Sequence, residues 1–317
     1  MSSVEFTRWL EQSGSRLYKG TVERRLALEQ QKARTIINNE KSWKWRLQDR
    51  KTWLNVALTL TGMRWFGERN QLNIQVKHHT LPIAKLPAAF NGFTVLQISD
   101  LHFNGNDALL ARLLSMINQL DYGICVLTGD YRFRSFGPID VSMNSLKSLV
   151  ETINSDVIAI LGNHDSVTMV PEMELLGIKV LLNERFELNK AGSQLLFVGV
   201  DDPSFYKTHD IAAALAGCES LEEKASVLLA HSPELYTEAE QAGFGAYLCG
   251  HTHGGQICTL FGKPLYRNYR SPNWTGAGQW QHGELNGYTS VGVGTSIVNV
   301  RFNCPPEITL HTLTCAS

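Results

Sequence analysis

Five short apolar runs recur along the chain, and polar residues follow each of them at once. The runs are TVLQIS, GICVLT, VIAIL, SVLLA and GAYLC, at residues 94–99, 123–128, 157–161, 226–230 and 245–249. Continuous apolar runs of this length are typical of strands that are buried in an α/β sheet. The pattern therefore predicts an α/β fold, in which the polar residues after each run lie where open sheets bind ligands.

The segments between these runs predict helices and further strands. Helical periodicity covers residues 107–119 and 139–153, whereas residues 72–79 alternate as an edge strand does. Near the C-terminus, residues 289–294, 298–302 and 307–313 have the composition of strands that would close a second sheet. We therefore expect a mixed sheet rather than a purely parallel one.

The first 71 residues differ in character from the rest. No glycine occurs between Gly20 and Gly62, and residues 1–80 hold 15 Lys and Arg against 7 Asp and Glu. Because helix-favouring residues predominate, we expect a basic helical extension over residues 1–71 and an α/β domain over residues 72–317.

Within this extension, residues 41–66 place tryptophans, lysines and arginines around the apolar stretch LNVALTLTGM. That stretch is about half as long as a bilayer-spanning helix requires. Two interpretations stay open. The segment is either a helix that lies in the headgroup region of an anionic membrane, or a helix that packs against the core of the α/β domain.

Composition narrows the class of protein. With 317 residues, 43% of them hydrophobic and 19% charged, the chain has the composition of a soluble globular protein. Its N-terminus lacks the apolar core of a signal peptide, so we expect a cytoplasmic protein, with peripheral attachment to the inner membrane face as an option. Six cysteines include no C-x-x-C pair, which excludes the usual spacing of a structural zinc site.

The polar residues after the five runs form a set of metal ligands. Carboxylates, an amide and imidazoles suit one or two divalent cations such as Mn, Fe, Zn or Co. Asp130 is the candidate bridge between two cations, because a carboxylate can give one oxygen to each. In extended backbone, residues two apart point the same way, as the D-x-H and H-x-H pairs would need. The candidates are Asp100, His102, Asp130, Asn163, His164, Asp165, His231, His251 and His253.

The motifs D-x-H, G-D, G-N-H-D, H and G-H-x-H, in this order, resemble those of the calcineurin-like metallophosphoesterases from about residue 72 to the end. The phrases GVDDP, AHSP, GHTHGGQ and VRFNCPPEITL are similar to the YkuE/YaeI-like branch, which includes UDP-2,3-diacylglucosamine pyrophosphatases. The resemblance implies a sandwich of two mixed β-sheets flanked by helices. One departure from many relatives is the text YRFR after Asp130, which places aromatic and cationic side chains beside the proposed metals.

The resemblance also implies roles for the candidate residues. Two divalent cations would neutralise the charge that builds up on a phosphorus under in-line attack. His164 would face the phosphate, where it stabilises the transition state or protonates the leaving oxygen. Asp165 either orients the His164 ring or caps the following helix, and we expect the orienting role. In the family pattern one cation is held by Asp100, His102 and His253, and the other by Asn163, His231 and His251.

Substrate recognition depends on weaker signals. Arg132, Arg134 and Arg270 are candidates for binding a second phosphate, as are Arg267 and Arg301, because a guanidinium group matches phosphate geometry. We expect hydrolysis of a phosphoanhydride or phosphodiester, with a nucleotide-linked lipid such as UDP-2,3-diacylglucosamine at the membrane surface as the leading substrate. A soluble phosphodiesterase or nucleotide phosphatase is the alternative. Two further alternatives are a non-catalytic scaffold and a protein that binds nucleic acid, whose binding would depend strongly on salt.

Overall fold

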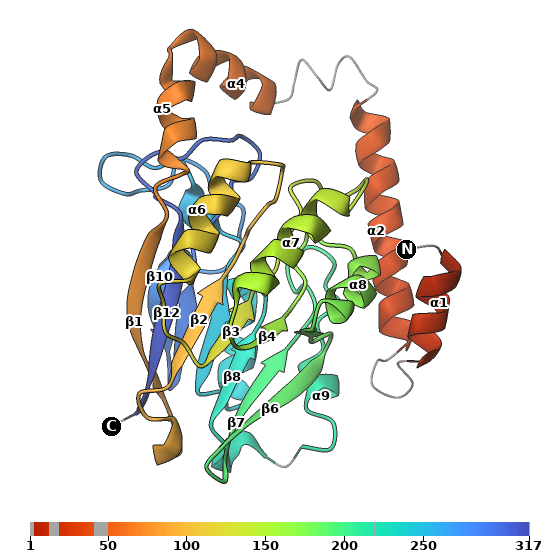
Figure 1. Ribbon diagram of the computed structural model, residues 1–317, viewed down its shortest axis with the longest axis vertical. Coiled ribbons are helices and arrows are strands. Elements are labelled where there is room, and N and C mark those ends of the chain that lie inside the picture. The colour runs from red at the N-terminus through yellow and green to blue at the C-terminus, as the bar shows by residue number, and fades with distance from the viewer. Residues whose placement is uncertain (1–2, 13–18, 41–49, 219, 317) are drawn as a thin grey trace.

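Two six-stranded sheets form the centre of the molecule. The computed structural model describes residues 3–12, 19–40, 50–218 and 220–316 (Figure 1). The first sheet has the order β1 (Gln75–Ile83), β12 (Glu307–Cys315), β2 (Thr94–Ile98), β3 (Ile124–Leu127), β4 (Asp156–Ala159) and β5 (Ile178–Val180). The second has the order β10 (Gly278–His282), β11 (Leu285–Thr289), β9 (Ala246–Cys249), β8 (Ser226–Leu229), β7 (Ser193–Gly199) and β6 (Glu184–Lys190).

Both sheets are mixed. In the first, β12 pairs antiparallel with β2, and the other neighbours are parallel. In the second, the outer pairs β10–β11 and β6–β7 are antiparallel, while β11, β9, β8 and β7 run parallel. The five apolar runs are β2, β3, β4, β8 and β9, so the predicted α/β class and the mixed sheets are confirmed.

Helices cover the outer faces of the sandwich. The first sheet carries α6 (Asp107–Ile117), α7 (Asp140–Thr152) and α8 (Val170–Leu175), and the second carries α9 (Ile211–Ala214) and α10 (Tyr236–Gln241). One apolar core lies between the two sheets, and one lies under each helical layer. Short 3₁₀ helices occur at Ala88–Phe90, Val167–Met169, Leu221–Glu223, Pro233–Leu235, His253–Gly255 and Asn273–Thr275.

Helix α6 shows how local sequence sets these elements. The side chain of Asn106 caps the helix by accepting a hydrogen bond from the amide of Leu109 at 3.1 Å. Leu109, Leu113 and Ile117 recur at every fourth position and are buried against the sheet. This helix begins where the polar loop after β2 ends, so it fixes the far end of the first ligand loop.

The N-terminal helices pack on the α/β core. They are α1 (Ser3–Gln12), α2 (Lys19–Glu40), α4 (Arg50–Leu60) and α5 (Met63–Asn70). Phe6, Leu10 and Val22 join the apolar core under α6, α7 and α8. Helices α1 and α2 therefore share an apolar core with the α/β domain. The domain boundary after residue 71 stays a prediction.

The segment expected either at a membrane or against the core has one buried face, and its other large apolar side chains are exposed to solvent. Leu58 of α4 is only 8% exposed and packs with Val298 and Val300. Gly67 of α5 lies so close to Val300 that a Cβ atom would collide with it. Most of the other large apolar residues of α4 and α5 are exposed. Residues 41–49 lie outside the described residues.

Three expectations for the C-terminal strands are wrong. Of residues 289–294, only Thr289 lies in a strand, at the end of β11. Residues 298–302 form a loop with an isolated bridge between Ile257 and Phe302, because the buried Arg301 side chain binds loop carbonyls there. Strand β12 joins the first sheet between β1 and β2 rather than closing the second. Sequence periodicity identifies a strand but carries no information about its sheet.

Candidate metal centre

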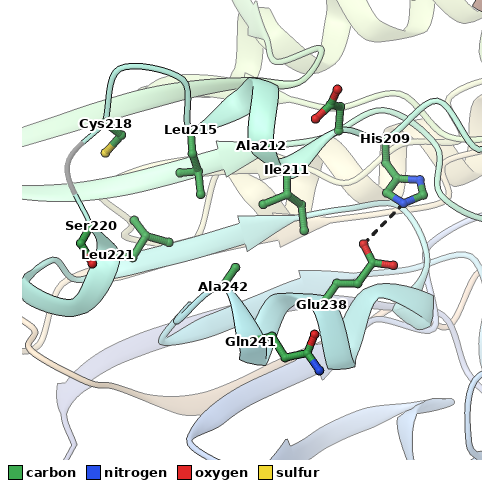
Figure 2. A pocket seen from close by; sticks show the side chains of 11 residues that line it. His209, Ile211, Ala212, Leu215, Cys218, Ser220, Leu221, Glu238, Gln241 and Ala242 are labelled. Carbon is green, nitrogen blue, oxygen red and sulfur yellow. Dashed lines mark ion pairs between the residues drawn. The ribbon is translucent and has the colours of Figure 1, made fainter.

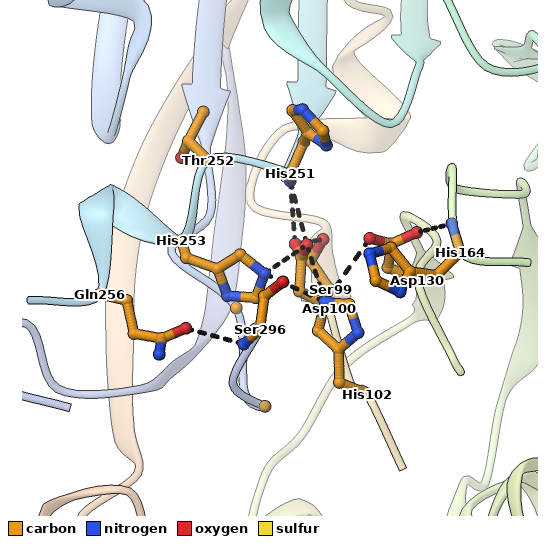
Figure 3. A network of polar contacts seen from close by, with 12 residues as sticks. Ser99, Asp100, His102, Asp130, His164, His251, Thr252, His253, Gln256 and Ser296 are labelled. Atoms are coloured by element: carbon orange, nitrogen blue, oxygen red, sulfur yellow. Dashed lines mark hydrogen bonds and ion pairs between the residues drawn. The ribbon is translucent and has the colours of Figure 1, made fainter. Parts of the chain in front are cut away.

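The loops after β2, β3 and β4 of the first sheet meet the loops after β8 and β9 of the second (Figure 3). The pairing of β2 with β3 continues past both strands, because Asp100 and His102 donate backbone hydrogen bonds to the carbonyls of Gly129 and Asp130. Across the two sheets, the amide of His251 donates to the Asp100 carboxylate at 3.0 Å. These bonds bring the five sequence motifs together at one end of the sandwich.

The first group of ligand atoms comes from Asp100, His102 and His253. The Nε2 atoms of His102 and His253 are 3.0 Å apart, and His253 Nε2 is 3.4 Å from Asp100 Oδ1. All three side chains are buried. Buried imidazole nitrogens that face each other beside a carboxylate are a suitable arrangement for a cation.

The second group comes from Asp130, His231 and His251. Asp130 Oδ2 is 3.2 Å from His231 Nε2, which is in turn 3.3 Å from His251 Nδ1. The same carboxylate oxygen is 3.5 Å from His102 Nε2 of the first group. Asp130 thus contacts both groups, as a bridging ligand must.

Three buried polar atoms in this region have no hydrogen-bond partner. They are Asn163 Oδ1, His251 Nε2 and His253 Nδ1. An unpaired buried polar atom is costly, and bound ions are one reason why such atoms persist. The donor set and the unpaired Asn163 Oδ1 fit two divalent cations that share Asp130, whereas the two unpaired ring nitrogens are those that do not face the ligand groups.

Backbone carbonyls select the tautomers of two histidines among the candidate ligands. His102 Nδ1 is 2.9 Å from the carbonyl of Arg132, and His231 Nδ1 is 2.8 Å from that of Thr128. Because a carbonyl can only accept, Nδ1 carries a proton, so Nε2 is the ring nitrogen left to bind a cation beside the carboxylates. The loops therefore hold His102 and His231 in the tautomer that a metal ligand requires.

The charges in the centre are strongly coupled. Burial alone would raise the pKa of Asp130. His231, His164 and His102 together lower it by more than burial raises it, so the pKa of Asp130 lies well below the usual range. Burial opposes protonation of His231, whereas the Asp130 and Asp100 carboxylates raise its pKa to about 10. A divalent cation competes with that proton, because both bind the same lone pair beside the same carboxylate.

Most candidate ligands have unusual backbone conformations. Five of them have positive φ, from 42° at His102 to 71° at His251. Such angles are uncommon outside glycine and cluster at functional sites. The expectation that extended backbone aligns the paired ligands is therefore wrong. The side chains of Asp100 and His102 converge from left-handed backbone instead.

Two glycines allow the loops to approach each other. A Cβ atom at Gly162 would collide with Asp130 Oδ1, and one at Gly250 would collide with Asp100 Oδ2. The G-N-H-D and G-H-x-H motifs thus need glycine because a carboxylate ligand occupies the space of a side chain.

His164 lies at the edge of the cluster. One of its ring nitrogens is within 4.8 Å of the ligand atoms of His102 and Asp130, and the two imidazole rings pack edge to face. Its Nδ1 is 2.9 Å from the carbonyl of Phe133. Burial lowers the pKa of His164 to about 3, although the Asp130 carboxylate favours the charged form.

The expected pairing of Asp165 with the His164 ring is wrong. The Asp165 carboxylate accepts hydrogen bonds from backbone amides of two loops, and the Phe133 carbonyl orients His164 instead. Burial and the Asp130 carboxylate raise the pKa of Asp165 to about 6, although the hydrogen bonds from backbone amides lower it. The donors are the amides of Asp130, Tyr131, Arg132 and Gly162, at 2.7 to 3.2 Å.

The structure gives the candidate arginines different environments. Arg132 is buried, and its guanidinium donates to the carbonyl of Gly137 at 2.9 Å. Arg301 is fully buried and donates to the carbonyls of Val291, Gly292, Gly294 and Cys304. Arg134 and Arg270 have exposed side chains, so substrate binding by them stays a prediction.

Helix α2 supplies residues that the sequence did not indicate. Arg25 is 1% exposed, and its guanidinium donates to the carbonyls of Gly162 and Asp165 at 2.8 and 3.0 Å. It also forms an ion pair with Asp201 at 2.8 Å. Lys32 donates to the carbonyl of Asn163 at 2.9 Å.

Helix α2 therefore holds the backbone of the loop that carries Asn163 and His164. Burial opposes the charge of Arg25, but Asp201 and Glu29 raise its pKa above the usual range. The spacing of Arg25, Glu29 and Lys32 at i, i+4 and i+7 was the available signal. In sequence it is indistinguishable from a solvated charged face.

A separate cavity of about 650 Å³ lies beside α9 and α10 (Figure 2). Its polar wall includes His209 and Glu238, whose Nε2 and Oε2 atoms are 3.6 Å apart, and Ile211 and Leu221 are among its apolar residues. None of the candidate metal ligands lines it. The cavity is therefore distinct from the metal centre.

Comparison with known proteins agrees with this geometry. A family model described as calcineurin-like phosphoesterase matches residues 93–255, which include all seven candidate ligands. The uncharacterised metallophosphoesterase YkoQ of Bacillus subtilis is 27% identical over 261 residues, covering 76% of this chain and 92% of that protein. Phosphodiesterase YaeI of Escherichia coli is 28% identical over 234 residues, covering 69% and 81%. The UDP-2,3-diacylglucosamine pyrophosphatase LpxG of Chlamydia muridarum is 36% identical over 93 residues, 27% of each chain.

Asp130→Ala should lower metal content more than Asn163→Ala does. The reason is that Asp130 contacts both groups of ligand atoms, whereas Asn163 is expected to serve only one. Elemental analysis of the purified variants measures this difference, with circular dichroism to confirm folding. Undiminished metal content in Asp130→Ala would remove Asp130 from the bridging role.

Arg25→Met should destabilise the fold by about 3–5 kcal/mol, because it leaves the buried Asp201 carboxylate without its cation. It should also weaken metal binding, because the Gly162–Asp165 backbone loses two donors. The neighbouring Arg24 is exposed, so Arg24→Met is the matched control. Denaturant unfolding and metal titration check both effects, and equal behaviour of the two variants would contradict the role of α2.

Proposed function

The chain belongs to the calcineurin-like phosphoesterase family and is a metal-dependent phosphoester hydrolase, and we propose that its substrate is a nucleotide-linked lipid. The bond cleaved is a phosphoanhydride or phosphodiester. The observation that carries this proposal is an exposed apolar surface on α4 and α5, which are anchored to the same loops that support the metal ligands.

The chemistry follows from the residues at the centre. Bound divalent cations would neutralise the negative charge that builds up on the phosphorus oxygens during in-line attack. Phe133 holds Nδ1 of His164, which leaves Nε2 for the phosphate side. To hydrogen-bond the phosphate or protonate the leaving oxygen, Nε2 must first gain a proton, which the Asp130 carboxylate and the negative charge of a bound phosphate would favour. Asp165 supports this step indirectly by fixing the loops on either side of it.

The apolar surface consists of side chains that the fold leaves in solvent. Leu60, the last residue of α4, is 83% exposed. Trp65 and Phe66 of α5 are also exposed. Its remaining members on these helices are Trp53, Leu54, Val56 and Met63. Tryptophan and phenylalanine with arginine on a short helix suit the membrane interface.

This surface is connected to the metal centre through buried contacts. The amide of Arg301 donates to the carbonyl of Gly67 in α5 at 3.0 Å. The Arg301 side chain then binds the carbonyls of Gly292 and Gly294, and Gly292 packs against the Asp100 side chain. A lipid substrate held at α4 and α5 would therefore have its phosphate region near the metal ligands.

The mode of membrane contact is peripheral in this proposal. None of the helices in the described part of the chain is long and apolar enough to cross a membrane. Attachment would depend on apolar side chains and on attraction between basic residues and anionic headgroups. The relative LpxG is named for UDP-2,3-diacylglucosamine, and this class of nucleotide-linked lipid is the one that we propose here.

His164→Gln should leave metal content near that of the wild type and reduce turnover by about two to four orders of magnitude, the usual contribution of a positioned acid. His78→Gln is the control, because His78 is exposed on β1. Steady-state kinetics with elemental analysis separate the two readouts. Parallel loss of metal and activity would make His164 a metal ligand.

Replacement of Leu60 and Phe66 by serine should slow hydrolysis of a lipid-linked nucleotide in vesicles, while bis(p-nitrophenyl) phosphate is hydrolysed at an unchanged rate. The buried Leu58 is unsuitable for this test because its loss would disturb the contact with Val298 and Val300. Val141→Ser, at an exposed site on α7, is the control. Equal loss on both substrates, with lower thermal stability, would favour a soluble phosphodiester or nucleotide as substrate.

A further inference from the structure

A short hairpin beside α4 and α5 ends in two exposed apolar side chains. Residues 258–264 turn back on themselves through a bridge between Cys258 and Pro264 and a backbone hydrogen bond from Thr259 to Lys263. At the tip, Leu260 is 88% exposed and Phe261 is 91% exposed. Side chains this apolar are seldom so exposed together without a binding partner.

The base of the hairpin is rigidly attached to the fold. Ile257 packs in one cluster with Leu58 of α4 and with Val298 and Val300. The amide of Cys258 donates to the carbonyl of Phe302 at 2.9 Å. The tip therefore projects from the apolar cluster that anchors α4.

The apolar surface continues beyond the hairpin. Leu265 and Tyr266 are exposed directly after it, and Ile297 is exposed in the neighbouring C-terminal loop. The side chain of Asn268 donates to the carbonyl of His251 at 2.9 Å, which ties this segment to a candidate metal ligand. The surface thus extends from α4 and α5 past the hairpin toward the metal centre.

The charge of this segment identifies its partner. Residues 241–283 contain no Asp or Glu, and their cationic side chains are Lys263, Arg267 and Arg270. A protein partner with an apolar surface would not require such a bias, whereas an anionic lipid surface attracts each of these cations. Apolar tips flanked by cations fit the boundary between headgroups and acyl chains.

We propose that residues 258–264 form a membrane-inserting hairpin, in which Leu260 and Phe261 enter the acyl-chain boundary of an anionic bilayer and Lys263 stays among the headgroups. This inference rests on the proposed function, because it supplies a second anchor for the surface formed by α4 and α5. Two neighbouring anchors, the hairpin and the surface formed by α4 and α5, would fix the orientation of the enzyme on the membrane. A single apolar helix would leave it free to rotate about that contact.

The test uses the full chain with Leu260→Ser and Phe261→Ser combined. Flotation with vesicles of phosphatidylethanolamine and phosphatidylglycerol should show binding weakened by about tenfold or more, because two large apolar side chains lose their burial. Leu175→Ser is the matched control, because Leu175 is 86% exposed at the end of α8, away from this surface. Hydrolysis of bis(p-nitrophenyl) phosphate should be unchanged in both variants.

The outcomes separate this inference from the proposed function. If the wild type binds the vesicles and the double variant binds equally well, the hairpin is not an anchor, while the lipid-linked substrate still stands. If the wild type does not bind the vesicles and shows no preference for a lipid-linked nucleotide, the proposed function itself is wrong. Concentration-dependent dimers in sedimentation that the double variant abolishes would make the hairpin an interface between copies of this chain, and would overturn the inference.

Discussion

The carboxylate of Asp165 joins the two loops on which the metal centre depends. Its Oδ2 accepts the amides of Asp130 and Gly162, and its Oδ1 accepts those of Tyr131 and Arg132. Hydrogen bonds to an ionised acceptor contribute about 1.5–3 kcal/mol each, and they also fix the direction of the peptides that donate them. Those peptides set the Asp130 side chain and place the Arg132 carbonyl against His102. The position of Asp130 relative to the other candidate ligands therefore depends on a residue that is not a candidate ligand itself.

Dense packing around this joint explains the unusual backbone of the ligands. With Asp130 Oδ1 filling the space beside Gly162, and Asp100 filling that beside Gly250, the loops cannot relax to extended conformations without separating the carboxylates. Positive φ at a residue such as His251 costs free energy, of order 1–3 kcal/mol in sparsely populated regions, and the surrounding hydrogen bonds must offset it. The result is a ligand cluster that is assembled by the fold in advance. A cation would therefore meet donor groups that already lie close together.

The strands and the residue types of the candidate ligands could be predicted from the sequence, because both are local properties. Apolar runs identify β2 and β3, and the side chains that follow them can only lie at strand ends. Partner choice is not local, and this is where prediction failed. Asp165 follows His164 directly, yet its four partners are backbone amides that no motif encodes. For the same reason β12 could be recognised as a strand but not assigned to the first sheet.

The N-terminal region shows the same limit and adds a functional consequence. Arg25 and Lys32 of α2 donate hydrogen bonds to backbone carbonyls of the loop after β4. Asp165 belongs to that loop and accepts a hydrogen bond from its Gly162 amide. Helix α5 supports the other flank of the centre through Gly67 and Arg301. Residues 19–40 and 50–70 thus contact different loops around one candidate metal centre, although neither segment supplies a candidate ligand. A segment that resembles a charged extension in sequence is physically part of the site, so changes in α4 and α5 and changes in the ligand loops act on connected structure.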